Sequence, residues 1–187
     1  QGISQRFGSE RFNIVDIGGG YGIFAEEMLS LFGRNTTVIE PGVHLAKSCR
    51  DRGIGVVEKF LEDVKDSDLP KGNKVFVSFE LFEHLHNPES FLIQLYKLML
   101  AGDMFILTTL SGTGLDILGL WENSKSVSPP HHLNFFNPYS IKLLFEKIGF
   151  KVLQVTTPGK LDIDILSSNL DLIKNRSLRA LVKHASD

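Results

Sequence analysis

Four glycines lie within five residues in the stretch DIGGGYG, which runs from Asp16 to Gly22 directly after a short apolar segment. Glycine allows a backbone to turn sharply and to lie close to a ligand, because it has no Cβ atom. The helix predicted to follow would add free N–H groups and the positive end of its dipole. The pattern indicates a strand-to-helix turn that holds a ligand. The alternative is a turn that needs glycine only for its own geometry, but four glycines exceed that requirement.

A second chemical feature is Glu40, which ends the next apolar segment and is followed by Pro41. It lies roughly 20 residues after Gly18, the interval typical of one strand–helix–strand unit in nucleotide-binding folds. A carboxylate at this position can accept hydrogen bonds from both ribose hydroxyls of an adenosine. The alternative is an ordinary exposed glutamate at a strand end. In combination with the glycine turn, Glu40 indicates an adenosine-binding site.

Two carboxylates and an imidazole lie within five residues in the stretch ELFEH, from Glu80 to His84. Such groups are ligands for Mg²⁺, Mn²⁺ or Zn²⁺, depending on their geometry. Glu80, Glu83 and His84 therefore form a candidate divalent-metal site, and an ion there could lower the pKa of a substrate hydroxyl. The alternative is that Glu83 and His84 only brace the loop while Glu80 contacts a bound ligand.

Two adjacent histidines, His131 and His132, precede a predicted helix in the stretch PPHHLNFF. A histidine with a pKa near neutrality can take a proton from a nucleophile during its attack. His131 and His132 are therefore the candidate catalytic residues, and we expect them near the same rim as Glu80. The alternative is a histidine whose ring nitrogen bonds the backbone and fixes the loop.

The elements that would position these residues alternate along the chain. Short apolar segments predict strands at residues 12–17, 36–39, 55–58, 74–79, 104–109 and 151–157. Helical patterns are predicted at residues 22–32 and 43–50, and again after the capping residues Asn87 and Asn137. The alternation predicts an α/β fold with a doubly wound, mostly parallel, Rossmann-like sheet of six or seven strands and helices on both faces. In such sheets ligands bind beyond the carboxyl ends of the strands, where the candidate residues lie.

The connection at residues 110–137 is longer than most α/β connections, which predicts a lid or a substrate-binding insertion. It contains the single Trp121 among several leucines. A short helix packed on the core, or a contact with a partner, is equally compatible with this apolar cluster. The tail at residues 161–187 has helical spacing and mixed charges, so we expect it to pack on the domain rather than to bind a membrane.

Length and composition narrow the classes of function. A chain of 187 residues predicts one domain, residues 1–187. The 20 Lys and Arg residues do not exceed the 22 Asp and Glu residues, which argues against a nucleic-acid partner. No apolar run reaches the roughly 18 residues of a membrane span, and the single Cys49 favours a reducing, cytoplasmic location. The first residue is Gln1 rather than Met, so one expectation is a truncated N-terminus; no oligomeric state is predicted.

The stretches VDIGGGYG and VIEP together resemble motifs of the class I S-adenosylmethionine-dependent methyltransferases. The likeness continues in FELFEHLHNPESFL and HHLNFFNPYSIKLLFEKIGFKV, and it covers roughly residues 12–155. The branch that it resembles includes ubiquinone-biosynthesis O-methyltransferases and related small-molecule methyltransferases. The resemblance implies the class I methyltransferase fold, S-adenosylmethionine as the cofactor, and an enzyme that methylates a small-molecule acceptor, with O-methylation favoured.

The resemblance also assigns contacts to the cofactor. The residues around its methionine part would be Asp16, Gly18, Gly19, Gly20 and Gly22. The ribose would be bound by Glu40 beside Pro41. The stretch under the methionine amino group would be Phe79, Glu80 and Leu81.

Two further assignments follow from the same resemblance. The adenine contacts would be Phe60, Leu61 and Glu62. This chain has Phe60 where an Asp is common, which implies that the adenine is held by stacking and by backbone groups. In the ubiquinone branch an E-x-x-E-H run is associated with a divalent ion, and this sequence reproduces that run from Glu80 to His84.

Two other functions stay open at this point. An NAD(P)-dependent oxidoreductase on a similar sheet is one of them, although the spacing here is G-x-G-x-G rather than G-x-G-x-x-G, and no obvious Tyr-x-x-x-Lys pair is present. The other is a non-catalytic S-adenosylmethionine-binding module that regulates a partner, because an intact cofactor site does not require an active acceptor site.

Overall fold

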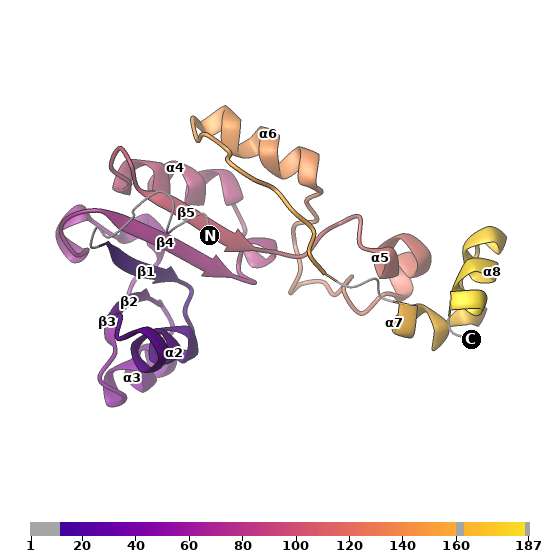
Figure 1. Ribbon diagram of the computed structural model, residues 1–187, viewed down its shortest axis with the longest axis horizontal. Coiled ribbons are helices and arrows are strands. Elements are labelled where there is room, and N and C mark those ends of the chain that lie inside the picture. Colours follow the sequence, from indigo (N-terminus) through magenta and orange to yellow (C-terminus); the bar gives the residue numbers. More distant parts are fainter. Residues whose placement is uncertain (1–11, 160–162, 186–187) are drawn as a thin grey trace. The chain divides into compact units, whose positions relative to one another are not determined.

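The computed structural model describes residues 12–159 and 163–185, which fall into two compact units (Figure 1). The first unit ends at Phe82 but also includes Asn87–Thr108, and the second comprises Glu83–His86 with the residues from Thr109 onward. The expectation of a truncated N-terminus concerns residues outside the described ranges. The single domain expected from the chain length stays a prediction.

A parallel sheet of five strands forms the first unit, in the order β3-β2-β1-β4-β5 (Figure 1). Its strands are β1 (Asn13–Ile17), β2 (Thr36–Ile39), β3 (Gly55–Val57), β4 (Lys74–Phe79) and β5 (Met104–Thr108). Every pair is parallel, and Ile14 lies opposite Thr36 on one side and Val75 on the other. Strands this apolar are buried on both faces, and both Val15 and Phe76 are fully buried. The sheet confirms the parallel α/β fold predicted from the sequence.

Three helices connect these strands, α2 (Ile23–Phe32), α3 (Val43–Asp51) and α4 (Pro88–Leu98). From the centre, the chain steps outward through β2 to β3 on one side and through β4 to β5 on the other. Right-handed crossovers therefore put α2 and α3 on one face of the sheet and α4 on the opposite face (Figure 1). Phe24 and Met28 of α2 pack on the sheet residues Ile14, Val75 and Val77. This doubly wound arrangement brings the carboxyl ends of all five strands to one edge.

A buried ion pair fixes the amino end of β4, at the opposite edge of the sheet. Lys74 and Asp103 are 1% and 8% exposed, and Nζ of Lys74 lies 3.9 Å from Oδ2 of Asp103. The carboxylate also accepts hydrogen bonds from the backbone N–H groups of Lys74 at 2.7 Å and Leu100 at 2.9 Å. Because both charges are partnered, the pair anchors the start of β4 to the turn before β5.

The second unit is helical. Its helices are α5 (Leu115–Leu120), α6 (Pro138–Ile148), α7 (Ile163–Ser167) and α8 (Arg176–Ala185). Leu120 of α5 packs in one core with the tail residues Leu166, Ile173 and Val182, all within this unit. Packing of the tail on the sheet domain stays a prediction. Trp121, which follows α5, is 66% exposed. Among the described residues, no helix combines the length and the apolar character needed to cross a membrane.

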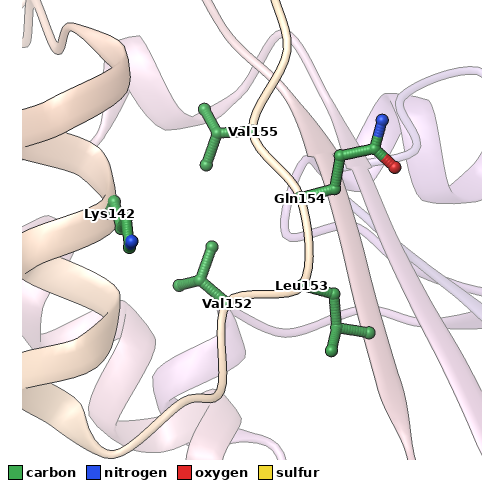
Figure 2. Close-up of a pocket in the computed structure, with 5 residues that line it drawn as sticks. All are labelled: Lys142, Val152, Leu153, Gln154 and Val155. Carbon is green, nitrogen blue, oxygen red and sulfur yellow. The ribbon is translucent and has the colours of Figure 1, made fainter.

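The predicted six or seven strands are corrected to five in the described residues, because residues 151–157 form no strand. Figure 2 shows Val152 and Val155 on the side of Lys142 in α6, whereas Leu153 and Gln154 point the other way. Successive side chains of a strand alternate between faces, so this segment is extended but irregular. A strand also needs a backbone partner, which the apolar character of KVLQVTT does not specify.

Candidate functional site

The glycine turn between β1 and α2 has three backbone positions in the left-handed region, with φ of 73° at Gly18, 54° at Gly20 and 76° at Gly22. A Cβ added at Gly18 would lie 2.8 Å from Cδ2 of Leu81, and one at Gly22 would lie 2.7 Å from Cδ1 of Ile54. These two glycines are therefore required by packing within the protein. At Gly20, by contrast, an added Cβ would have no atom within 4 Å. The space over Gly20 is open, as expected for a backbone that approaches a ligand.

Glu40 lies at the carboxyl end of β2, where it joins the glycine turn to the start of α3. Its Oε2 accepts a hydrogen bond from the N–H of Gly20 at 3.0 Å, and its Oε1 accepts one from the N–H of Gly42 at 2.8 Å. The side chain is held in place by these bonds, and the residue is only 7% exposed. A carboxylate has about four acceptor positions, so both oxygens keep capacity for further donors. Glu40 is therefore bonded directly to the glycine turn, and its predicted role as the ribose ligand stays a prediction.

A second carboxylate, Asp16, lies under the same turn and is 2% exposed. A Cβ added at Gly19 would lie 2.6 Å from Oδ2 of Asp16, so the acid and the turn are in close contact. Burial, followed by the negative charge of Glu40, raises the pKa of Asp16 from 3.8 to about 7. Two carboxylates beside one open backbone turn favour a cationic ligand, because a positive charge would stabilise the ionised form of Asp16.

The predicted adenine contacts, which follow β3, differ in their exposure. Phe60 is 63% exposed, so its ring is available for stacking. Leu61 begins the short 3-10 helix η1 (Leu61–Asp63) and is 3% exposed, which makes its side chain part of the core. Glu62 is exposed on the same turn. Of these three residues, only Phe60 and Glu62 present a side chain to solvent.

The residues at the carboxyl end of β4 contact three different neighbours. The ring of Phe79 lies 4.9 Å from that of Phe24 in α2, while Leu81 packs on Gly18. Between them, Glu80 has a φ of 49°, an unfavourable conformation for a residue with a side chain. Its Oε1 accepts a hydrogen bond from Oγ1 of Thr108 at 2.5 Å. Thr108 was not among the predicted site residues, and its position at the end of β5 was the signal that could have identified it.

The first unit also contains an apolar cavity that the sequence did not indicate, with a volume of about 250 Å³. It lies on the face of the sheet that carries α2, and Phe24, Met28 and Phe79 are among its lining residues. Its other lining residues are Phe12, Ile14, Val75, Val77 and Ile106. Apart from Phe12, which precedes β1, these side chains come from three strands and a helix, so no local pattern could reveal the cavity.

The second unit brings both predicted histidine segments together. The rings of His84 and His132 lie 5.0 Å apart, and each Nδ1 lies 2.7 Å from a carbonyl oxygen, that of His131 for His84 and that of Ser126 for His132. Glu83 is 2% exposed and accepts a hydrogen bond from Thr109 at 2.8 Å. The bracing role considered for Glu83 and His84 is therefore present.

The predicted metal set is only partly reproduced. Among the described residues, the group able to hold a metal is Glu83, His84 and His132, whose ligand atoms lie within 4.8 Å of one another. His132 takes the place expected for Glu80, whose carboxylate is bonded to Thr108 in the first unit. His131 contributes its backbone carbonyl, and its side chain is exposed.

Comparison with protein families identifies a relationship that covers most of the chain. A family model described as a methyltransferase domain matches residues 3–155. No curated protein sequence matches the chain.

Solved structures share the fold at low sequence identity. A protein from Thermotoga maritima, described as a SAM-dependent methyltransferase and possible histamine N-methyltransferase, aligns over 76% of this chain and 65% of its own, with a TM-score of 0.58 and 21% identity. The plantazolicin methyltransferase BamL, solved with a triazolic desmethylPZN analog and SAH, aligns over 98% and 73%, with a TM-score of 0.64 and 16% identity. The mycolic acid cyclopropane synthase CmaA1, complexed with SAH and CTAB, aligns over 92% and 66%, with a TM-score of 0.61 and 18% identity. The chain thus spans less than two thirds of the Thermotoga protein.

Proposed function

Because the chain belongs to the methyltransferase domain family, we propose that it is an enzyme that transfers a methyl group from S-adenosylmethionine to a small molecule. The acceptor atom that we favour is an oxygen. The observation that carries the proposal is the pair of buried carboxylates, Asp16 and Glu40, beside the open space over Gly20. Structural relatives solved with SAH support the choice of cofactor.

Charge distinguishes this cofactor from a dinucleotide. S-adenosylmethionine has a sulfonium and an ammonium group against one carboxylate, so its net charge is positive. A dinucleotide would bring a pyrophosphate with two negative charges to the same glycine turn. Asp16 lies against that turn at Gly19, and like charges at such a distance repel one another. The charge of Asp16 at the glycine turn therefore disfavours the alternative NAD(P)-dependent oxidoreductase.

In the proposed complex, the ribose hydroxyls donate to the acceptor positions that Glu40 retains beside its bonds to Gly20 and Gly42. The methionine part lies along the glycine turn, where the open space over Gly20 admits it and Asp16 faces its positive charge. The exposed ring of Phe60 offers a stacking surface for the adenine. The remaining proposed contacts with the cofactor are made by Pro41, Phe79, Glu80 and Leu81.

The reaction moves one methyl group and one proton. The acceptor oxygen forms a bond to the methyl carbon while the carbon–sulfur bond breaks, and its electron pair stays on sulfur as S-adenosylhomocysteine leaves. The protein contributes mainly by aligning oxygen, carbon and sulfur. The hydroxyl proton would pass to His131 or His132, the two histidines predicted as candidate catalytic residues. No step of this transfer requires the metal ion predicted at Glu80, Glu83 and His84.

Calorimetry with the purified chain tests the cofactor. We expect binding of S-adenosylmethionine and S-adenosylhomocysteine but not of NADH. Glu40→Ala should weaken cofactor binding by about 1–3 kcal/mol, because hydrogen bonds to a charged group are lost. Glu27→Ala, which removes an exposed carboxylate of α2, is the matched control and should bind normally. NADH binding without S-adenosylmethionine binding would overturn the proposal.

A second assay tests catalysis. The chain is incubated with a metabolite extract and S-adenosylmethionine labelled in its methyl group, and mass spectrometry identifies which small molecule gains the label. A labelled ether or ester would support O-methylation. Tight cofactor binding with no labelled product in any extract would instead favour the non-catalytic regulatory module.

A further inference from the structure

We propose that Glu83, His84 and His132 form a binding site for a Zn²⁺ ion, with His132 rather than Glu80 as the third ligand. The three residues come from two segments of the second unit that are far apart in the sequence. The inference concerns metal binding alone and does not depend on methyl transfer.

The distances within the group suit a compact ion. One ligand atom from each residue lies within 4.8 Å of the others. Zinc bonds to nitrogen and oxygen are about 2.0–2.2 Å long, which puts tetrahedral ligand atoms about 3.4 Å apart. The widest pair would therefore close by about 1.4 Å on binding. His84 is exposed and His132 is half-buried, so both rings have room for this adjustment.

Backbone carbonyls fix which nitrogen of each histidine is available. A carbonyl oxygen only accepts hydrogen bonds, so the 2.7 Å contacts of both Nδ1 atoms, to His131 for His84 and to Ser126 for His132, require a proton on Nδ1. In the neutral ring the lone pair then belongs to Nε2. Metal-binding histidines are commonly oriented in this way, with the other ring nitrogen donating to a carbonyl or carboxylate.

The carboxylate ligand is equally constrained. Oε2 of Glu83 accepts a hydrogen bond from Thr109 at 2.8 Å. The carbonyl of Glu83 accepts two further bonds, from the N–H groups of Leu133 at 2.8 Å and Asn134 at 3.0 Å. These bonds hold the segment with Glu83 and His84 against the segment with His132. The site is therefore organised by protein contacts before any ion binds.

The ligand types decide between ions. Mg²⁺ prefers oxygen ligands, whereas imidazole nitrogens suit Zn²⁺ and related transition metals. The set predicted from the sequence has two carboxylates and one imidazole. The group in the structure, with His132 in place of Glu80, has one carboxylate and two imidazoles. Three protein ligands of this kind leave one of the four zinc positions open.

The test measures binding in metal-free protein without any activity assay. We expect one equivalent of Zn²⁺ per chain by calorimetry, little binding of Mg²⁺, and visible absorption bands of tetrahedral Co²⁺ when cobalt replaces zinc. His132→Ala should weaken Zn²⁺ binding at least 100-fold, and Thr109→Val, which removes only the support of Glu83, about 10-fold. His86→Ala is the matched control, because this exposed histidine lies outside the group.

Two variants keep the result interpretable. His132→Ala could disturb the loop by removing the bond to Ser126, so Glu83→Gln provides an independent loss of a ligand that retains an acceptor for Thr109. Circular dichroism confirms that each variant is folded. Glu80→Gln should leave Zn²⁺ affinity unchanged. The proposal is overturned if the protein binds no Zn²⁺, if Mg²⁺ binds as tightly, or if Glu80→Gln weakens binding as much as His132→Ala does.

Discussion

Removing the charge of Asp16 should stabilise the cofactor-free protein at alkaline pH. The side chain is almost fully buried, and burial together with the charge of Glu40 raises its pKa from 3.8 to about 7. In the unfolded chain the carboxyl ionises at its ordinary pKa, so the folded state binds the proton more tightly. Protonated Asp16 therefore makes its full contribution to the free energy of unfolding below about pH 4, and this contribution is lost as the pH rises to about 7.

The size of the effect follows from the shift. One pKa unit corresponds to about 1.4 kcal/mol, so ionised Asp16 costs the folded state about 4 kcal/mol at pH 8. At pH 5 the folded protein keeps the proton on Asp16, whereas the unfolded chain has released it. The folded state is then disfavoured by only about 1.6 kcal/mol. The asparagine side chain in the Asp16→Asn variant has a similar shape and no charge. The free energy of unfolding of Asp16→Asn relative to wild type should therefore increase by about 2.5 kcal/mol between pH 5 and pH 8.

Urea denaturation followed by circular dichroism, without cofactor, measures this difference at each pH. Subtracting the free energy of unfolding of wild type from that of the variant at each pH cancels the contributions of the other titrating groups. Asp63→Asn, at an exposed position of η1, is the control and should show no such pH-dependent difference. If Asp16→Asn and wild type keep a constant difference from pH 5 to pH 8, the inferred electrostatic cost at this site is refuted.

Further predictions concern cofactor binding and the opposite edge of the sheet. Affinity for S-adenosylmethionine should rise as the pH increases up to about 7, the pKa of Asp16 in the free protein, and then level off. Calorimetry should show that Asp16→Asn abolishes this rise. Gly20→Ala should weaken cofactor binding at least 10-fold, because its methyl group enters the open space, while the φ of 54° adds about 1–2 kcal/mol of destabilisation in urea. Lys74→Met should lower the free energy of unfolding by about 3 kcal/mol, since it leaves the buried carboxylate of Asp103 without its cation, and cofactor affinity of the folded variant should be unchanged.

Local sequence patterns predicted the parts of the site that depend on local backbone geometry. The glycine turn could be recognised because left-handed backbone at Gly20 strongly favours glycine. Glu40 could be recognised because a strand–helix–strand unit fixes its distance along the chain from the turn. Asn87 and Asn137 do cap α4 and α6, with side-chain bonds to the backbone one turn ahead. Each of these features is determined by residues close to it in sequence.

Features that depend on distant contacts were less predictable. Thr109 and Glu83 are 26 residues apart, and His84 meets the carbonyl of His131 across 47 residues, so no local spacing reveals either bond. The exchange of His132 for Glu80 in the metal group has the same origin. Residues 151–157 were expected to form a strand because their composition suits one, but strand formation also requires a partner that composition cannot supply.

The cost at Asp16 and the proposed preference for S-adenosylmethionine have the same electrostatic cause. A buried carboxylate near another carboxylate destabilises the cofactor-free fold when it ionises, as the raised pKa shows. A cation bound beside it lowers that pKa and recovers part of the lost free energy as binding energy. After methyl transfer, S-adenosylhomocysteine lacks the sulfonium charge and recovers less. The same carboxylate that weakens the empty protein would therefore favour the substrate form of the cofactor over its product, and Asp16→Asn should reduce the ratio of their affinities.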